Sequence, residues 1–135
     1  KREIQSQFKI KDFMVEKEEC PILELKNLTL ESALKTIEEG KLGFSIIEEN
    51  AHFKGIISNA DVRKALLRNI NDLSSLPPAE LINETPITIN ENLTVNDMLQ
   101  LVRDQSIPLM YLPVVSDNGE ATGVVSFLNL IKGEI

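Results

Sequence analysis

The chain of 135 residues contains one sequence pattern twice, and this duplication constrains its fold more than any other feature. The segment from Cys20 to Leu34 aligns without gaps with the segment from Thr85 to Leu99, at an offset of 65 residues. Further along, Gly55–Ser58 aligns with Gly123–Ser126 at an offset of 68 residues. Because order, residue type and spacing are all preserved, we expect one structural unit built twice.

Each copy predicts the same run of elements, β-α-β-β-α. A Pro-Ile pair opens an extended stretch, because proline biases its neighbours away from helix. Thr29 and Thr94 are the expected N-caps of helices whose apolar residues recur at helical spacing, among them Leu34 and its equivalent Leu99. The remaining expected elements are strands at 44–47, 53–57, 111–115 and 121–125, hairpin turns at 50–51 and 118–119, and helices at 60–69 and 127–132.

The duplication predicts an α+β fold, an α/β sandwich of two repeats related by a pseudo-two-fold axis. One copy of about 50 residues is too short to bury its own apolar face, whereas two copies together form an adequate core. Apolar residues make up 42% of the chain, which is enough for such a core. The expected boundaries are a lead-in linker or first helix at 1–19, repeat 1 at 20–70, a polar connector at 71–84 and repeat 2 at 85–135.

Charge and composition exclude several functional classes. The net charge of -7 repels a phosphate backbone, so we expect no nucleic-acid partner. No stretch approaches the roughly 20 apolar residues of a membrane span, so we expect no membrane partner. The single Cys20 permits no internal disulfide and indicates the reducing cytoplasm. Since the chain begins with Lys1 rather than Met, we expect a piece of a longer protein.

The turn after the last strand of repeat 1 is the strongest candidate binding site. Ser58 ends that strand and a helix begins near Ala60, so free backbone amides and the positive helix end favour an anion such as phosphate there. Asp61 can accept hydrogen bonds from two adjacent hydroxyls, as a carboxylate holding a ribose does. Arg63 and Lys64 follow one turn later and can add positive charge.

A purely structural interpretation of this turn stays open. Ser58 and Asp61 also match a capping box, which is common at helix starts, and Arg63 and Lys64 also fit a solvated helix face. The equivalent residues in repeat 2 are Ser126 and Asn129, and an amide lacks the charge that strengthens a carboxylate-to-diol contact.

Nothing else in the sequence indicates catalysis. The chain has one histidine, His52, and one cysteine, so neither a zinc site nor a nucleophilic triad can be assembled. No glycine-rich phosphate loop is present. We therefore expect no catalytic residue, no metal and no cofactor, and expect that this segment is not itself an enzyme.

The repeated motifs resemble a pair of CBS (cystathionine β-synthase) domains, known as a Bateman module. The resemblance rests on the two Pro-Ile pairs, on Gly-h-h-Ser-x-x-Asp/Asn at 55–61 and 123–129, and on the lead-in Ile10–Met14. It implies a regulatory module that binds an adenosine-type ligand between the copies and that commonly pairs as a homodimer. The ligand residues it implies, together with those of the turns above, are Pro21, Ile22, Ser58, Asp61, Arg63, Pro86, Ile87, Ser126 and Asn129.

A narrower resemblance points to the regulatory tail of arabinose-5-phosphate isomerases. It rests on residues 40–47, 54–66 and 127–135, although Ser58-Asn-Ala-Asp61 stands where that family has Thr-Asp-Gly-Asp, and Asn129 where it has Asp. It implies an upstream SIS (sugar isomerase) domain in the same chain, an isomerase active in 3-deoxy-manno-octulosonate (Kdo) formation for lipopolysaccharide or capsule, and a nucleotide-sugar ligand. The alternatives are an assembly module without a small ligand, and the tail of another enzyme such as a sugar nucleotidyltransferase.

Overall fold

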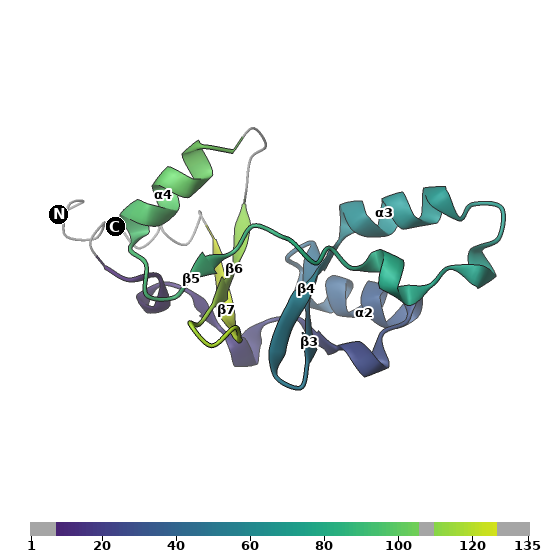
Figure 1. Cartoon of the computed structure of the whole chain (residues 1–135), viewed down its shortest axis with the longest axis horizontal. Helices are drawn as coiled ribbons and strands as arrows, with labels where there is room; N and C mark the ends of the chain where they lie inside the picture. The colour runs from purple at the N-terminus through teal and green to yellow at the C-terminus, as the bar shows by residue number, and fades with distance from the viewer. Residues whose placement is uncertain (1–7, 106–109, 127–135) are drawn as a thin grey trace. The chain divides into compact units, whose positions relative to one another are not determined.

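The structure is a computed structural model that describes residues 8–105 and 110–126. These residues form two compact units, which Figure 1 shows with their helices labelled. The first-repeat unit is Cys20–Pro86, and the second-repeat unit joins the described residues up to Glu19 to those from Ile87 onwards. The helix predicted at 127–132, and with it Asn129, lies outside the described residues.

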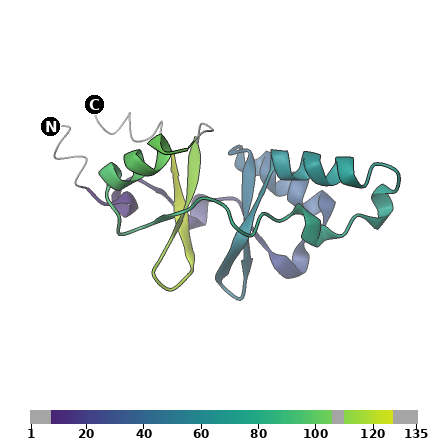
Figure 2. The same cartoon turned by 45° about the horizontal axis from the view of Figure 1, so that its top comes forward.

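The first-repeat unit is a three-stranded sheet with two helices on one face (Figures 1 and 2). Its strand order is β2-β3-β4, with β2 parallel to β3 and β3 antiparallel to β4. The elements are β2 (Ile22–Glu24), η3 (Leu25–Asn27), α2 (Leu30–Gly40), β3 (Phe44–Glu49), β4 (His52–Ser58), α3 (Asn59–Arg68), η4 (Leu73–Ser75) and η5 (Pro78–Leu81).

Both helices of this unit share one core with the sheet, because each has an apolar stripe of helical period. The stripe residues and their strand partners are all buried, so the two helices are fixed on the same side of the sheet. The core consists of Leu28, Ala33, Ile37, Ile47, Ile57, Val62, Ala65 and Leu81.

The second-repeat unit has a four-stranded sheet of order β1-β7-β6-β5. Here β5 is parallel to β6, while β6–β7 and β1–β7 are antiparallel pairs. Its buried core is Ile10, Ile89, Val95, Met98, Leu112, Val114 and Val125. The elements are η1 (Ile10–Asp12), β1 (Val15–Glu16), η2 (Lys17–Glu19), β5 (Ile89–Asn90), α4 (Val95–Arg103), β6 (Tyr111–Val115) and β7 (Ala121–Ser126).

In each unit, a segment that comes before a repeat's own first strand crosses the last strand of the sheet at a glycine. Val15 pairs with Val124 on β7, and a Cβ on the adjacent Gly123 would collide with the Val15 carbonyl oxygen. Asn83 pairs with Ile56 on β4, and a Cβ on Gly55 would collide with the Asn83 carbonyl oxygen. The glycine of each Gly-h-h-Ser motif therefore permits close backbone approach.

Most predicted elements agree with the structure to within two residues at each end. The prediction that Pro86-Ile87 lies on a strand is wrong, because β5 begins at Ile89, two residues later than the repeat implies. The connector is also more ordered than a polar loop, since it contains η4 and η5. Near η4, hydroxyls of Ser75 and Ser74 donate to Asp72 and hold the pKa of that carboxyl below its ordinary value.

The hairpin turns occur where they were expected, but with unequal strain. Asn50 and Ala51 have φ of 52° and 68°, and in the second repeat Gly119 has φ of 80°. A left-handed backbone is easy for glycine and unfavourable for alanine. The turn of β3–β4 therefore carries strain that the turn of β6–β7 avoids.

We expect Ala51→Gly to stabilise the chain by about 1 kcal/mol, because glycine removes the left-handed strain at this position. Urea unfolding followed by circular dichroism measures the effect. Gly119→Ala is the reciprocal control and should lose a similar amount, since no atom lies within 4 Å of its would-be Cβ and backbone strain alone acts. A destabilised Ala51→Gly protein would contradict this account of the turn.

Candidate functional site

Ser58 stands at the junction of β4 and α3, where it is the N-cap of the helix. Its Oγ accepts a hydrogen bond from the Asp61 backbone N–H (3.1 Å) and donates one to Asp61 Oδ2 (2.8 Å). The same Oδ2 accepts the Ser58 backbone N–H at 2.9 Å. The capping-box interpretation of this turn is therefore confirmed, with both side chains half-buried.

The capping box occupies much of the hydrogen-bonding capacity that was expected to face a ligand. The amides of Ser58 and Asp61 are paired within the box, and the amide of Asn59 donates to the Gly43 carbonyl at 3.0 Å. What the turn still offers is Asp61 Oδ1, which has no partner among the described residues. A ligand at this turn would thus meet a fixed carboxylate oxygen rather than a row of free amides.

A second capping box has nearly the same geometry but a different place in the repeat. Thr94 caps α4, where Asp97 Oδ2 accepts from the Thr94 amide (2.9 Å) and hydroxyl (3.0 Å), and the Asp97 amide donates back at 3.1 Å. This turn follows β5, outside the Gly-h-h-Ser motif. The two boxes are therefore a matched pair for separating helix capping from any further role.

Pro21 and Ile22 lie at the same end of the first-repeat sheet as Ser58. Ile22 pairs with Ile46 on β3, while Ser58 pairs with Phe44 two residues earlier on that strand. With β3 between them, the two outer strands are about 10 Å apart. The carbonyl of buried Pro21 accepts the Ile46 amide (2.8 Å) and the Ser45 hydroxyl (3.3 Å).

The second-repeat unit does not repeat this arrangement in full. Ser126 ends β7 as predicted, pairs with Tyr111 and is 4% exposed. Pro86 and Ile87 precede β5 instead of lying on it, and Ile87 packs against the core of the unit. The prediction of a ligand contact at Asn129 falls on a residue that is not described.

The charged and reactive residues that were singled out lie apart from one another. Arg63 and Lys64 are exposed on α3 and form no ion pair with any described residue. His52 is exposed at the β3–β4 turn, where its Nδ1 lies 3.0 Å from the Asn50 carbonyl oxygen. In the described ranges, 8–105 and 110–126, no three acidic, imidazole or thiol side chains lie together as metal ligands. Over the same ranges, no helix is both long and apolar enough to cross a bilayer.

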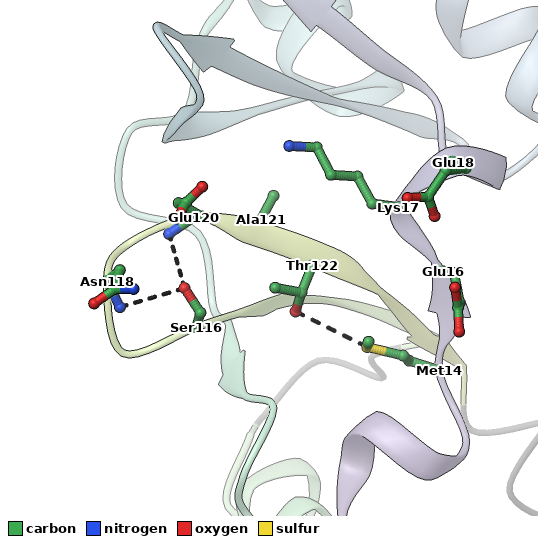
Figure 3. A pocket seen from close by; sticks show the side chains of 9 residues that line it. All are labelled: Met14, Glu16, Lys17, Glu18, Ser116, Asn118, Glu120, Ala121 and Thr122. Atoms are coloured by element: carbon green, nitrogen blue, oxygen red, sulfur yellow. Dashed lines mark hydrogen bonds between the residues drawn. The ribbon is translucent and has the colours of Figure 1, made fainter.

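The second-repeat unit also has an open groove that the motifs did not indicate (Figure 3). It lies between the lead-in strand and the β6–β7 hairpin, at the end of β7 opposite Ser126, and has a volume of about 400 Å³. Glutamates and Lys17 form its rim, and Thr122 Oγ1 contacts Met14 Sδ at 3.9 Å. The lining residues are Met14, Glu16, Lys17, Glu18, Ser116, Asn118, Glu120, Ala121 and Thr122.

One sequence difference between the repeats marks this groove. At the offset of 68 residues, the small Ala121 on its floor aligns with the large Phe53 of repeat 1. The substitution is visible in the alignment, but only the folded hairpin and lead-in strand show that it borders a hollow. None of the predicted ligand residues lines the groove.

Comparison with known proteins relates this geometry to one family. The family model for the CBS domain matches residues 79–134. A crystal structure of CBSX2 in complex with AMP has a TM-score of 0.76 at 17% identity and covers 94% of this chain and 96% of that one. A crystal structure of CbpB in complex with c-di-AMP has a TM-score of 0.75 at 16% identity and covers 98% of this chain and 88% of that one.

A similarity in sequence alone points to a longer protein. A Haemophilus influenzae protein named as a probable arabinose 5-phosphate isomerase is 29% identical over 106 residues. The match covers 78% of this chain and 30% of that protein. The chain thus spans less than a third of the length of this curated relative.

We expect Ser58→Ala and Thr94→Ala to lower the free energy of unfolding by similar amounts, about 1 kcal/mol each, because each removes an N-cap of the same geometry. Urea unfolding of both variants tests this. A loss at Thr94 without one at Ser58 would show that the Ser58 box does not stabilise the fold.

Proposed function

Starting from a chain that is a pair of CBS domains, as its repeat predicted, we propose that it is a regulatory module that binds an adenosine-type nucleotide or a nucleotide sugar. The proposal is supported by two similar CBS-pair structures whose bound molecules, AMP and c-di-AMP, both contain adenosine phosphate. Its role is binding rather than catalysis, and its ligand biases an attached domain through differential affinity for two states of the whole protein.

The observation that carries this proposal is the turn at Ser58. A half-buried carboxylate is held rigidly by three hydrogen bonds at the end of a strand, and Oδ1 remains to accept from a ligand. A preorganised acceptor of this kind suits the adjacent hydroxyls of a ribose, because little ordering is left to the binding step. Pro21 and Ile22, at the same end of the sheet, are the proposed neighbours of the base.

The remaining ligand residues stand as proposals of unequal weight. Arg63 is exposed one turn along α3, at a position from which a phosphate could be paired. Ser126 holds the equivalent place in the second repeat, where we propose a weaker contact together with Asn129, Pro86 and Ile87. If one repeat alone binds ligand, Asp61 supplies the key contact.

We expect titration with AMP, ATP, c-di-AMP or CMP-Kdo to produce saturable heat in isothermal calorimetry. Ser58→Ala with Asp61→Ala should abolish it by removing the carboxylate. Thr94→Ala with Asp97→Ala is the matched control, which removes an equivalent capping box outside the proposed site and should bind normally. Absence of heat from all four compounds at millimolar concentration would reject the proposal.

We further propose that the chain is the tail of a sugar-phosphate aldose-ketose isomerase with an upstream SIS-type domain, acting in carbohydrate metabolism that leads to lipopolysaccharide or capsule in the cytoplasm. The support is the similarity to the Haemophilus influenzae relative and the motifs at 40–47 and 54–66. On this basis the nucleotide sugar would act as feedback. The motifs do not extend to the groove of Figure 3, which this proposal leaves without a role.

The encoding gene should continue upstream of Lys1 into a SIS-type domain, and the full-length protein should interconvert arabinose 5-phosphate and ribulose 5-phosphate. A coupled assay of the purified full-length protein, with and without the nucleotide that binds the module, measures both activity and regulation. An upstream nucleotidyltransferase domain would favour the alternative enzyme, and the calorimetric result would stand either way.

A further inference from the structure

The helices of the first-repeat unit expose apolar side chains that the repeat does not explain. Leu34 on α2 is 45% exposed, although helical spacing placed it on the core stripe, and its equivalent Leu99 on α4 is half-buried. On α3 and just beyond it, Leu67 is 66% and Ile70 is 60% exposed. Side chains exposed singly need no explanation, but a group on adjoining helices indicates a contact surface.

These side chains belong to one layer of the molecule. α2 and α3 pack on the same face of the sheet through Ala33 and Ile37 on one helix and Val62 and Ala65 on the other (Figures 1 and 2). Their remaining sides therefore form the outer face of that layer. We call this outer face, with Leu34, Leu67 and Ile70, the helical face.

The two helices carry opposite charge on the helical face. On α2 the exposed charged residues are Glu31, Lys35, Glu38 and Glu39, and Lys35 is already paired with Glu31 at 2.9 Å. On α3, Arg63 and Lys64 are exposed and unpaired among the described residues. The helical face thus has an acidic strip beside a basic strip, each with exposed leucine.

The described helix of the second repeat lacks this character. The exposed residues of α4 are Asn96, Asp97, Gln100 and Arg103, all polar. Its apolar residues Val95 and Met98 are buried in the unit's core. Of the described helices, only those of repeat 1 expose leucine.

We propose that the helical face binds a second copy of this chain, repeat 1 against repeat 1 about a two-fold axis, with α3 of each copy against α2 of the other. In a two-fold interface the same surface meets itself, so every contact occurs twice. Pairing α3 with α3 would oppose the basic residues Arg63 and Lys64. Pairing α3 with α2 instead joins basic to acidic residues and buries the exposed leucines.

This interface goes beyond the proposed nucleotide site and uses neither Ser58 nor Asp61. It selects among the arrangements of a homodimer, since a head-to-tail pair would place repeat 1 against repeat 2. Its test contains no nucleotide, so the outcome is independent of whether the module binds one.

Reciprocal charge reversal tests the interface. The acidic variant is Arg63→Glu with Lys64→Glu, and the basic variant is Glu31→Lys with Glu38→Lys. Each alone places like charges opposite one another and should raise the dimer dissociation constant by about 100-fold. Mixed in equal amounts, the two should form a heterodimer, because both α3–α2 contacts then join opposite charges. Sedimentation equilibrium and light scattering measure the masses.

Two further variants keep the outcome decisive. Leu67→Glu alters a side chain that is largely exposed, so it should fold normally, as circular dichroism will show, and should be monomeric. Gln100→Glu with Arg103→Glu on α4 is the matched control and should dimerise as the wild type does. A monomeric wild-type protein, acidic and basic variants that dimerise normally, or a control that alone becomes monomeric would each overturn the proposal.

Discussion

Two close backbone approaches complete the sheets of this protein. Asn83 can lie against β4, and Val15 against β7, because Gly55 and Gly123 have no Cβ at the crossing points. Each crossing segment precedes a repeat in the chain, yet it packs against the other repeat's last strand. Neither unit is therefore an isolated copy of the sequence repeat, and a side chain at either glycine would force the crossing backbone away.

The same strand that accepts a crossing segment ends at the candidate site. β4 runs from the turn at His52, past Gly55, to Ser58, where the capping box turns the chain into α3. The box serves the fold first, because it satisfies amides that a helix start leaves open. It also leaves one carboxylate oxygen of Asp61 fixed and accessible to a partner, so a structural motif becomes a proposed recognition element without any change in its geometry.

The repeat predicted much of this fold but less of its surface. Strand and helix positions followed from hydrophobic period and turn residues, since both report local backbone preference. The start of β5 at Ile89 did not follow, because strand register depends on the partner strand β6 and not on the Pro-Ile pair. Leu34 was expected on the core stripe and is 45% exposed, because the core of the first repeat is closed by other residues, Leu28 and Leu81 among them.

The sequence by itself determined the duplication, the order of elements in each copy, the capping residues and the absence of a recognisable catalytic set, because these depend on neighbours along the chain. The tertiary structure alone decided which amides remain free at the Ser58 turn, that a groove lies beside Ala121, and which apolar side chains of α2 and α3 stay exposed. Those features depend on what distant segments cover, and covering is a property of packing in three dimensions.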